Sequence, residues 1–415
     1  MARASGTTDI AIVGGGLVGA SLAWALRGLG YEVAVIEKVA FREASQPSYD
    51  DRTLALSYSS CQILTGLGLW EGLSPNATPI REIIVAEPGR PGRVTLSASE
   101  SGLPAFGHVV EARVFGSVVL EKLNAPGLVS WHCPATVTGI RTGNDCNELD
   151  VESENGALTL KARLVVAADG AASAVRRMLG IGSRDFDYQQ TAVICNVTPS
   201  EPHRGRAWEW LTESGPFAIL PHAGDRCGLV WSVPSDQAKH YMDMDDDRFL
   251  LEARRRFGSE LGQFKRIGRR SAYPLKLVRA LQDTSSRVII MGNAAHAIHP
   301  AGAQGFNLGL RDVAVLAELL SARADIDPGE ATILEEYSRW RRPDQDDTVA
   351  WTDGLVRLFA NRTMAAGLVR TAGMMAHALI PPLRRRLASK AMGYRGRTPK
   401  LALGHPLSKP PGNIE

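Results

Sequence analysis

Three glycines near the start of the chain have the spacing that lets a backbone hold a phosphate group. Gly14, Gly16 and Gly19 form the pattern G-x-G-x-x-G between an apolar stretch and a periodic one, which predict a strand and a helix. The first glycine allows a tight turn, the second lets the main chain approach a pyrophosphate, and the third lets the helix pack on the strand. We therefore predict dinucleotide binding at this turn, where the helix start also attracts anions.

An acidic residue supports this prediction. Glu37 ends the next apolar stretch, about 20 residues after the glycines, where a carboxylate accepts hydrogen bonds from ribose hydroxyls. A glycine-rich turn in some other α/β protein is the alternative, and it gives no reason for the acid.

Two further apolar stretches each end in a glycine beside a polar side chain. Asp169-Gly170 follows "TLKARLVVAA", and Gly292-Asn293 follows "RVIIM". In an open α/β sheet, ligands bind at the carboxyl ends of the strands. Three such ends that converge on one ligand favour a long molecule. We therefore expect FAD, with the Asn293 amide bonded to a ribityl or ribose hydroxyl.

The loop after Asn293 is rich in small residues, and its sequence is "AAHAIHPAGAQGFNLGL". Gly302 and Gly305 permit close approach of a ligand without a side-chain clash. A helix that begins near Gln304 points its positive end at that ligand, which suits the negative charge on the pyrimidine edge of a reduced flavin. A turn that merely begins a helix is the simpler alternative.

His296 and His299 lie in the same loop and invite a metal interpretation. They are three residues apart, and no cysteine or carboxylate lies near them in the sequence to complete a site. We expect no metal. A structural role or a place beside the flavin is favoured, and whether a histidine acts as a base is left open.

These residues need a frame of strands and helices that brings them together. We predict an α/β fold: a Rossmann-like FAD-binding domain, an inserted antiparallel-sheet substrate domain and a helical C-terminal tail. The frame consists of a βαβ unit (Asp9–Val13, Ser21–Leu29, Tyr31–Glu37), two further strands (Thr159–Ala168, Arg287–Met291), a long helix (Gln304–Ala322) and short β-rich stretches between residues 186 and 273. The predicted FAD-binding domain is discontinuous (1–75, 100–180 and 280–350), the substrate domain comprises 76–99 and 181–279, a basic helical region covers 351–395, and 396–415 form a flexible tail.

Composition restricts the class of protein. With 415 residues, 44% of them hydrophobic and 22% charged, the chain is ordinary for a soluble globular protein of two interleaved or sequential domains. Its five cysteines are scattered and odd in number, which fits reduced thiols in the cytoplasm rather than a disulfide scaffold. We expect no signal peptide before the first strand.

The C-terminal region is basic and has apolar positions at helical spacing. Residues 355–415 include 11 Lys and Arg against one acidic residue. Arg370, His377 and Pro381-Pro382 interrupt the region too often for a membrane-spanning helix. A basic amphipathic segment can lie on anionic lipid, so we expect peripheral contact with a membrane, such as the inner face of the plasma membrane. The alternative is a helix packed on the body with a solvated basic face, and we expect no nucleic-acid binding.

Three stretches together resemble the FAD-contact motifs of the class A flavoprotein aromatic hydroxylases, the group typified by p-hydroxybenzoate hydroxylase. They are "DIAIVGGGLVGASLAWAL", "VVAADGAASAVR" and "GNAAHAIHPAGAQGFNLGLRDV". The wording of "YDDRTLALSYSSCQIL", "RSAYPL" and "GFNLGLRDV" is similar to the ubiquinone-biosynthesis hydroxylases of this class. An Asp is usual in the class where this chain has Asn293. The ubiquinone branch tolerates Asn, so the contact becomes neutral and the expectation of FAD stands.

The resemblance implies a fold of the p-hydroxybenzoate hydroxylase type and a monooxygenase that uses FAD, with NAD(P)H and O2 as co-substrates. On this resemblance, a nicotinamide would reduce the flavin, O2 would add to give a C4a-hydroperoxide, and the aromatic ring of a polyprenylated phenol would be hydroxylated. Water must be excluded, which an apolar pocket achieves. No second G-x-G-x-x-G follows, so NAD(P)H is expected to visit rather than to reside.

The resemblance also implies a role for each site residue. Pro300 would lie near the reactive flavin carbon, and Gly305, Phe306 and Asn307 would present backbone N–H groups to the pyrimidine edge. The implied cofactor-binding residues are Gly14, Gly16, Gly19, Glu37, Arg52, Arg113, Asp169, Gly170, Gly292, Asn293, Gly302 and Gln304. In the inserted sheet, Phe217, Leu220, Pro221, Trp231 and Tyr273 are candidates for the substrate pocket, although ordinary core packing explains each of them more simply.

Two alternatives stay open. A sister hydroxylase that acts on a different ring carbon of the same pathway would carry the same motifs. A non-catalytic prenyl-binding escort, as Rab escort proteins are, shares the type of fold but has no reason to keep the loop from Pro300 to Asn307. With either hydroxylase we also expect association with a ubiquinone-biosynthesis protein complex.

Overall fold

A mainly parallel sheet forms the base of the fold in the computed structural model, which describes residues 4–40, 52–323 and 325–407. Runs such as Ile10–Val13 are apolar throughout and buried, as strands covered on both faces require. The strand order is β18 (Thr284–Ser285), β19 (Val288–Ile290), β11 (Gly156–Ala167), β1 (Ala4–Val13), β2 (Val33–Ile36) and β8 (Ser130–His132), with β1 parallel to both β2 and β11.

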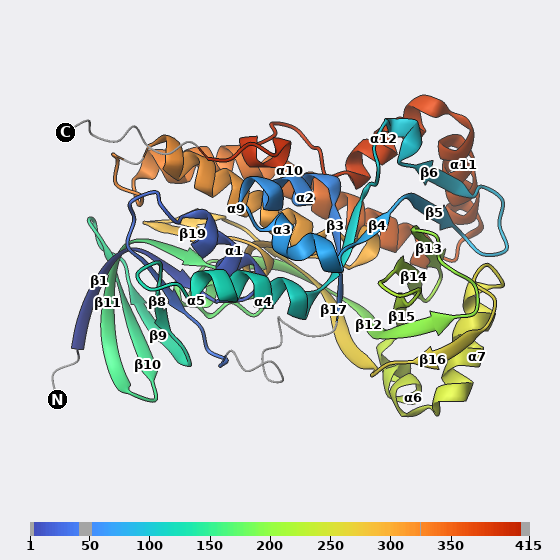
Figure 1. Ribbon diagram of the computed structural model, residues 1–415, viewed down its shortest axis with the longest axis horizontal. Helices are drawn as coiled ribbons and strands as arrows, with labels where there is room; N and C mark the ends of the chain where they lie inside the picture. The colour runs from blue at the N-terminus through green and yellow to red at the C-terminus, as the bar shows by residue number, and fades with distance from the viewer. Residues whose placement is uncertain (1–3, 41–51, 324, 408–415) are drawn as a thin grey trace.

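Two different layers cover this sheet (Figure 1). Side chains along β1 alternate between them: Ile10 and Ile12 belong to a core shared with helices, whereas Ala11 and Val13 belong to a core on the other face. The helical layer consists of α1 (Leu17–Ala25), α4 (Ala112–Leu123), α9 (Gly305–Ala322) and α10 (Ala331–Ala360). The core on the other face is completed by α5 (Ala174–Met178) and by β9 (Ala135–Arg141) and β10 (Asn147–Ser153), which belong to the same sheet because β10 pairs with the first half of β11.

A second sheet lies at the other end of the molecule (Figure 1). Its strands are antiparallel except for one parallel pair, and they come from residues 82–97 and 183–280. All of these strand residues but Ala280 lie within the two stretches assigned above to a substrate domain. The order is β16 (Phe264–Ile267), β12 (Ser183–Pro199), β15 (Cys227–Pro234), β14 (Gly215–Pro221), β13 (Arg206–Thr212), β5 (Glu82–Ala86) and β6 (Val94–Ser97), and β17 (Ser271–Ala280) also pairs with β12. Helices α6 (Ala238–Asp243) and α7 (Asp246–Phe257) pack on its outer face.

Short elements connect the two sheets. A third sheet has the order β3 (Thr53–Ser57), β7 (Gly107–Glu111) and β4 (Thr78–Ile80), and the helices α2 (Tyr58–Gly66), α3 (Trp70–Leu73) and α8 (Asn293–His296) lie beside the parallel sheet. Helix α10 is shared by both ends: it buries Ile333 and Tyr337 in the helical core and Phe359 near its far end. The predicted boundary at residue 350 therefore falls inside a continuous helix.

The C-terminal region packs on the body. Helix α11 (Met364–Leu379) is held by Arg370, whose guanidinium is buried and contacts Glu87 at 3.1 Å; α12 (Pro381–Ala391) begins at the proline pair. The flexible tail predicted for 396–415 is corrected over 396–407. There Leu401, in the 3-10 helix η5 (Lys400–Leu403), is fully buried in the helical core. Residues 408–415 lie outside the described part of the chain.

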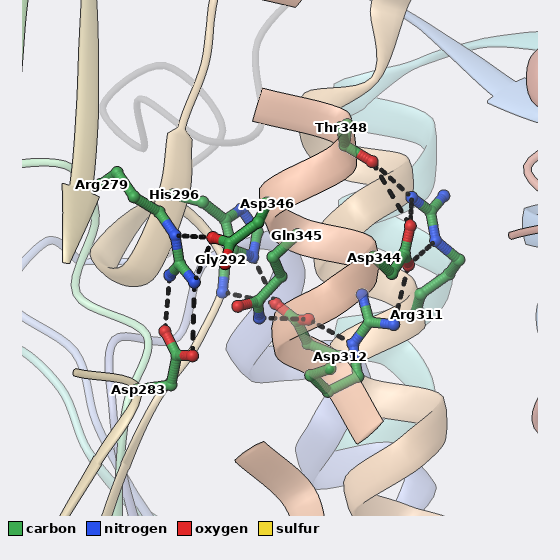
Figure 2. Close-up of polar contacts among 11 residues, drawn as sticks. Arg279, Asp283, Gly292, His296, Arg311, Asp312, Asp344, Gln345, Asp346 and Thr348 are labelled. Atoms are coloured by element: carbon green, nitrogen blue, oxygen red, sulfur yellow. Dashed lines mark hydrogen bonds and ion pairs between the residues drawn. The ribbon is translucent and has the colours of Figure 1, made fainter. Parts of the chain in front are cut away.

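A buried carboxylate on α9 joins several of these elements (Figure 2). One oxygen of Asp312 accepts hydrogen bonds from Arg341 at 2.8 Å and from Gln345 at 3.0 Å. Its other oxygen contacts Nε2 of His296 at 2.5 Å and accepts from the backbone N–H of Gly292 at 3.1 Å. The contacts connect α9 with α10, with α8 and with the end of β19.

Charge compensation keeps this network ionised. Burial opposes the charge on Asp312, but His296 and Arg341 outweigh it and hold its pKa below the usual range. Burial also opposes ionisation of Asp344, yet Arg311 and Arg341 lower its pKa to about 2. A carboxyl group with a lowered folded-state pKa stabilises the fold above its unfolded pKa of roughly 4, and this contribution is lost as the pH falls toward 2.

Asp312→Ala is predicted to lower the free energy of unfolding by about 3–5 kcal/mol, because it leaves the Arg341 guanidinium buried with half of its partners. Asp346→Ala is the matched control, since Asp346 is half exposed and its partner Arg279 keeps Asp283. We expect the control to cost less than about 1 kcal/mol. Chemical denaturation followed by circular dichroism measures both. Equal effects of the two substitutions would contradict the importance of the Asp312 network.

Candidate functional site

A cavity of about 1150 Å³ runs between the two sheets. This volume exceeds the roughly 300–1,000 Å³ of a typical small-molecule pocket, so the cavity has room for a dinucleotide and a second molecule. It extends from the carboxyl ends of the parallel strands to α11 and α12. Thirteen of the predicted cofactor and catalytic residues line it: Gly14, Gly16, Glu37, Arg52, Asp169, Gly170, Asn293, Pro300, Gly302, Gln304, Gly305, Phe306 and Asn307.

The glycine turn after β1 is closely packed. Gly14 has φ +103°, and a Cβ there would lie 2.5 Å from the carbonyl oxygen of Ala168. A Cβ on Gly19 would lie 1.9 Å from the carbonyl oxygen of Gly14, so this residue packs the helix on the turn and does not line the cavity. Gly16 begins α1 without a side-chain cap. The first N–H groups of the helix are therefore left for a ligand anion.

Carboxylates lie at the ends of β2 and β11. Glu37 is nearly buried, and its two oxygens accept hydrogen bonds from the N–H groups of Gly15 at 2.6 Å and Val39 at 2.8 Å. Asp169 uses one oxygen to accept from Ala174 at 2.7 Å, at the start of α5, while its buried Oδ1 has no partner among the described residues. A buried acceptor without a partner costs about 1–3 kcal/mol, which a ligand hydroxyl would recover. The site thus fits a ribose-containing cofactor.

The loop between α8 and α9 forms the far wall of the cavity. Gly302 (φ +68°) and Ala303 (φ +51°) both have left-handed backbone conformations within the 3-10 helix η4 (Ala301–Ala303). The Asn307 side chain fixes this turn: its Oδ1 accepts from the N–H of Ser57 at 2.8 Å, and its Nδ2 donates to the carbonyls of Ala55 and Ala303. The Asn307 side chain therefore ties the loop to β3, a role the sequence did not indicate.

The two loop histidines make hydrogen bonds that stabilise the fold around the loop. His296 binds Asp312 and is fully buried. Nδ1 of His299 accepts from the N–H of Ala301 at 3.1 Å, so its Nε2 donates to Gln190 at 3.2 Å, and burial lowers its pKa to about 4. His299 is therefore neutral near pH 7. Within the described ranges, no group of three or more His, Cys, Asp or Glu residues could hold a metal ion.

The predicted substrate-pocket residues on β14 and β15 lie mostly on the face of the sheet that points away from the cavity. On β14 and β15 the cavity is lined by Ala218, Leu220 and Val230, whereas the alternate residues Phe217 and Trp231 face the core under α7. The centroids of their two rings lie 5.4 Å apart. A strand turns successive side chains to opposite faces, and periodicity alone does not tell which face is lined. Of the five candidates, Leu220 lines the cavity and Phe217, Pro221, Trp231 and Tyr273 do not.

Besides Gly19, two predicted cofactor residues lie away from the cavity. Arg113 is half exposed and pairs with Glu111 beside it. Gly292 contributes indirectly, because its N–H binds Asp312 and fixes the loop that starts at Asn293. Their proposed contacts with the cofactor stay predictions.

One functional candidate was missed. Glu209 lies in "WEWLTES" and faces the cavity from β13, where it accepts a hydrogen bond from the N–H of Gly302 at 3.0 Å. Burial raises its pKa, although the Gly302 amide lowers it in part. The sequence does contain a signal for it: Glu209 is the one acid between Trp208 and Trp210, and in a strand whose tryptophans face the core it must point to the opposite face.

Known proteins share this arrangement. A family model described as "FAD binding domain" matches residues 7–352. Ubiquinone hydroxylase UbiL from Rhodospirillum rubrum is 39% identical over 404 residues, which cover 96% of this chain and 93% of that protein. The 3-demethoxyubiquinol 3-hydroxylase from Escherichia coli is 32% identical, with coverage of 93% and 98%. The crystal structure of p-nitrophenol 4-monooxygenase PnpA from Pseudomonas putida DLL-E4 has a TM-score of 0.76 at 19% identity, covers 94% of this chain and 100% of that chain, and confirms the predicted fold.

Gly14→Ala is predicted to weaken FAD binding by on the order of 10- to 100-fold, because the new Cβ meets the Ala168 carbonyl in a left-handed backbone conformation. Titration of the apoprotein with FAD, followed by flavin fluorescence, measures the affinity. Gly354→Ala in α10 is the control, since a Cβ there meets open space. Unchanged affinity in the Gly14 variant would show that this turn does not approach the cofactor.

Proposed function

The chain belongs to the FAD-binding-domain family, and on this premise we propose that it is an FAD-dependent monooxygenase that hydroxylates the aromatic ring of a polyprenylated phenol in ubiquinone biosynthesis. One observation carries the proposal: a single cavity joins three strand ends of the parallel sheet to the loop under the antiparallel sheet. The names of the two bacterial relatives supply the pathway and the type of reaction.

The residues at the strand ends would hold FAD. Gly14 and Gly16 would approach the pyrophosphate, Glu37 and Asp169 would accept from hydroxyls, and the start of α9 would face the ring system. Bound FAD, reduced by NADH or NADPH, supplies the activation of O2. The protein's part is to place the phenol against the loop at Pro300 and to exclude water there.

The far end of the cavity suits a prenyl chain. Its wall there is mostly apolar and comes from the end of α10 and from α11 and α12, which pack beside β6. A phenol whose ring lies near Pro300 would extend its chain along this wall and so bury apolar surface. The wall residues are Leu355, Leu358, Phe359, Val369, Met374 and Leu387.

The outer surface of the same helices suits a membrane. Met364 (87%), Leu368 (70%) and Leu379 (70%) on α11 are largely exposed, and α12 adds the exposed Arg385 and Arg386. An apolar helix face beside arginines is the pattern of a segment that rests on anionic lipid. None of the described helices combines the length and the apolar character that crossing a bilayer demands. The surface therefore supports peripheral contact, which would let the prenyl chain enter from the bilayer.

The ring carbon that is hydroxylated distinguishes the main alternatives. The motifs resemble those of 2-octaprenyl-6-methoxyphenol hydroxylases, and a sister enzyme of the same pathway would act at another carbon. A non-catalytic prenyl-binding escort is disfavoured by the retained loop and by the unpartnered Oδ1 of Asp169 within the described structure. We also propose that the protein associates with other ubiquinone-biosynthesis proteins, because its relatives are named for reactions of that pathway.

Purified protein is predicted to be yellow and to oxidise NAD(P)H faster when a short-chain prenylphenol is added, because the phenol consumes activated oxygen. Mass spectrometry should find one added oxygen atom in the product, and NMR should give its ring position. An unprenylated phenol is the control and should stimulate less. Bound flavin without stimulation by any phenol would contradict the proposed substrate, and a colourless protein would favour an escort.

Leu368→Glu together with Leu379→Glu is predicted to reduce binding to vesicles of phosphatidylglycerol and phosphatidylcholine by at least about tenfold, since each buried leucine contributes roughly 1.5–3 kcal/mol. Co-sedimentation measures the bound fraction. Leu251→Glu, at a half-exposed site on α7, is the control and should bind as the unchanged protein does. Loss of NAD(P)H oxidation in solution would show damage to the fold instead. Equal binding of all three proteins would remove α11 as the lipid surface.

A further inference from the structure

We propose that Glu209 is the residue that orients the phenolic hydroxyl of the substrate and accepts its proton during hydroxylation. The inference rests on the proposed function and adds a base to it. Three observations carry it: the side of the strand from which Glu209 points, its contact with the Gly302 loop, and the apolar wall around it.

Side chains alternate between the two faces of β13, and that of Glu209 lies on the face toward the cavity. Ala207, Glu209 and Leu211 line the cavity, whereas the indole of Trp210 packs with Phe257 in the core on the other side of the sheet. Glu209 is paired with Ala218 on β14 and with Val85 on β5, and neither neighbour carries a polar side chain. A glutamate there is a single ionisable group on an apolar sheet face, within the described part of that face.

The carboxylate touches the loop on which the reaction depends. Its Oε1 accepts from the N–H of Gly302 at 3.0 Å, two residues after Pro300. No described residue donates to Oε2, so this oxygen is available to a substrate hydroxyl. A phenol that donates to Oε2 would have its ring beside the loop that faces the flavin.

Within the described ranges, the strands and the loop next to this carboxylate bring no countercharge to it. The cavity-facing residues of β5, β14, β15 and η4 are not ionisable, and the pKa of Glu209 is raised by burial and partly restored by the Gly302 amide. A carboxylate with a raised pKa is a better base near neutral pH. Several charged groups elsewhere on the wall or on α10 have other partners: Arg52 lies over Tyr273, Arg177 donates to the Ala172 carbonyl, Arg370 pairs with Glu87, Lys390 and Arg395 pair with Asp347, Asp353 binds Tyr188 and Arg357, and His377 contacts the Gly373 carbonyl.

The proton transfer makes the ring a stronger nucleophile. The phenolic O–H bond breaks, its electron pair moves into the ring, and the proton joins Glu209. The ring carbon then forms a bond to one atom of O2, the O–O bond breaks, and the other atom leaves as water, with the two electrons coming from NAD(P)H through FAD. Loss of the ring proton restores aromaticity, and Glu209 returns its proton to the phenolic oxygen.

Glu209→Gln is the decisive variant, because it keeps the shape and an acceptor for Gly302 but cannot take up a proton. Glu213→Gln, in the turn that follows β13, is the matched control, since Glu213 is exposed and pairs with Arg362. Glu209→Asp keeps a carboxyl group and should retain part of the activity. FAD content and melting temperature are recorded for all variants and should match those of the unchanged protein.

The first readout needs no turnover. A 4-nitrophenol carrying one prenyl group is bound to the oxidised holoenzyme, and its visible phenolate band is followed against pH. The negative charge of Glu209 disfavours a second anion beside it, so the Gln variant should show roughly tenfold more ionised probe at a given pH. The Glu213 variant should titrate as the unchanged protein does. Identical titrations in all proteins would overturn the proposal.

The second readout is the rate of a single hydroxylation turnover with a short-chain prenylphenol. In the unchanged protein the rate should fall as the pH drops through the pKa of Glu209. In Glu209→Gln the rate should be at least about 100-fold lower. It should rise about tenfold per pH unit as the phenol ionises in solution. An unchanged rate and profile, or loss of FAD from this variant, would overturn the role of Glu209. Absence of hydroxylation in the unchanged protein would instead refute the proposed function.

Discussion

One buried carboxylate fixes the segments on which the cofactor site is built. Asp312 accepts from Gly292 at the end of β19, contacts His296 in α8, and binds Arg341 and Gln345 in α10. The loop that carries Pro300 starts at the first of these contacts and ends at α9, which carries Asp312 itself. Because charges without partners are costly in the interior, the two ends of the loop are held in one relative position.

The local part of the site could be predicted from the sequence. Gly14, Glu37 and Asp169 were found because nucleotide binding requires small or acidic residues at strand ends, and each requirement is met within a few positions of the chain. The Asp312 network could not be found in this way. Its partners lie 16 to 33 residues apart and come together only when α9 and α10 pack.

Side-chain direction explains the remaining differences. Phe217 and Trp231 are large and apolar, as pocket residues often are, but they lie one position away from the residues that line the cavity. The same alternation concealed Glu209, whose tryptophan neighbours suggested core. The burial of Leu401 could not be predicted either, because a short apolar group among basic residues does not indicate that it packs in the helical core.

The position of Leu401 has a consequence for biosynthesis. It lies in the same core as Ile63 and Leu64 of α2, so this helix is completed by a side chain that is synthesised more than 300 residues after it. At roughly 5–20 residues per second, the apolar side chains of α2 wait tens of seconds before Leu401 is made. The packing of α2 is therefore one of the late steps in the folding of this chain.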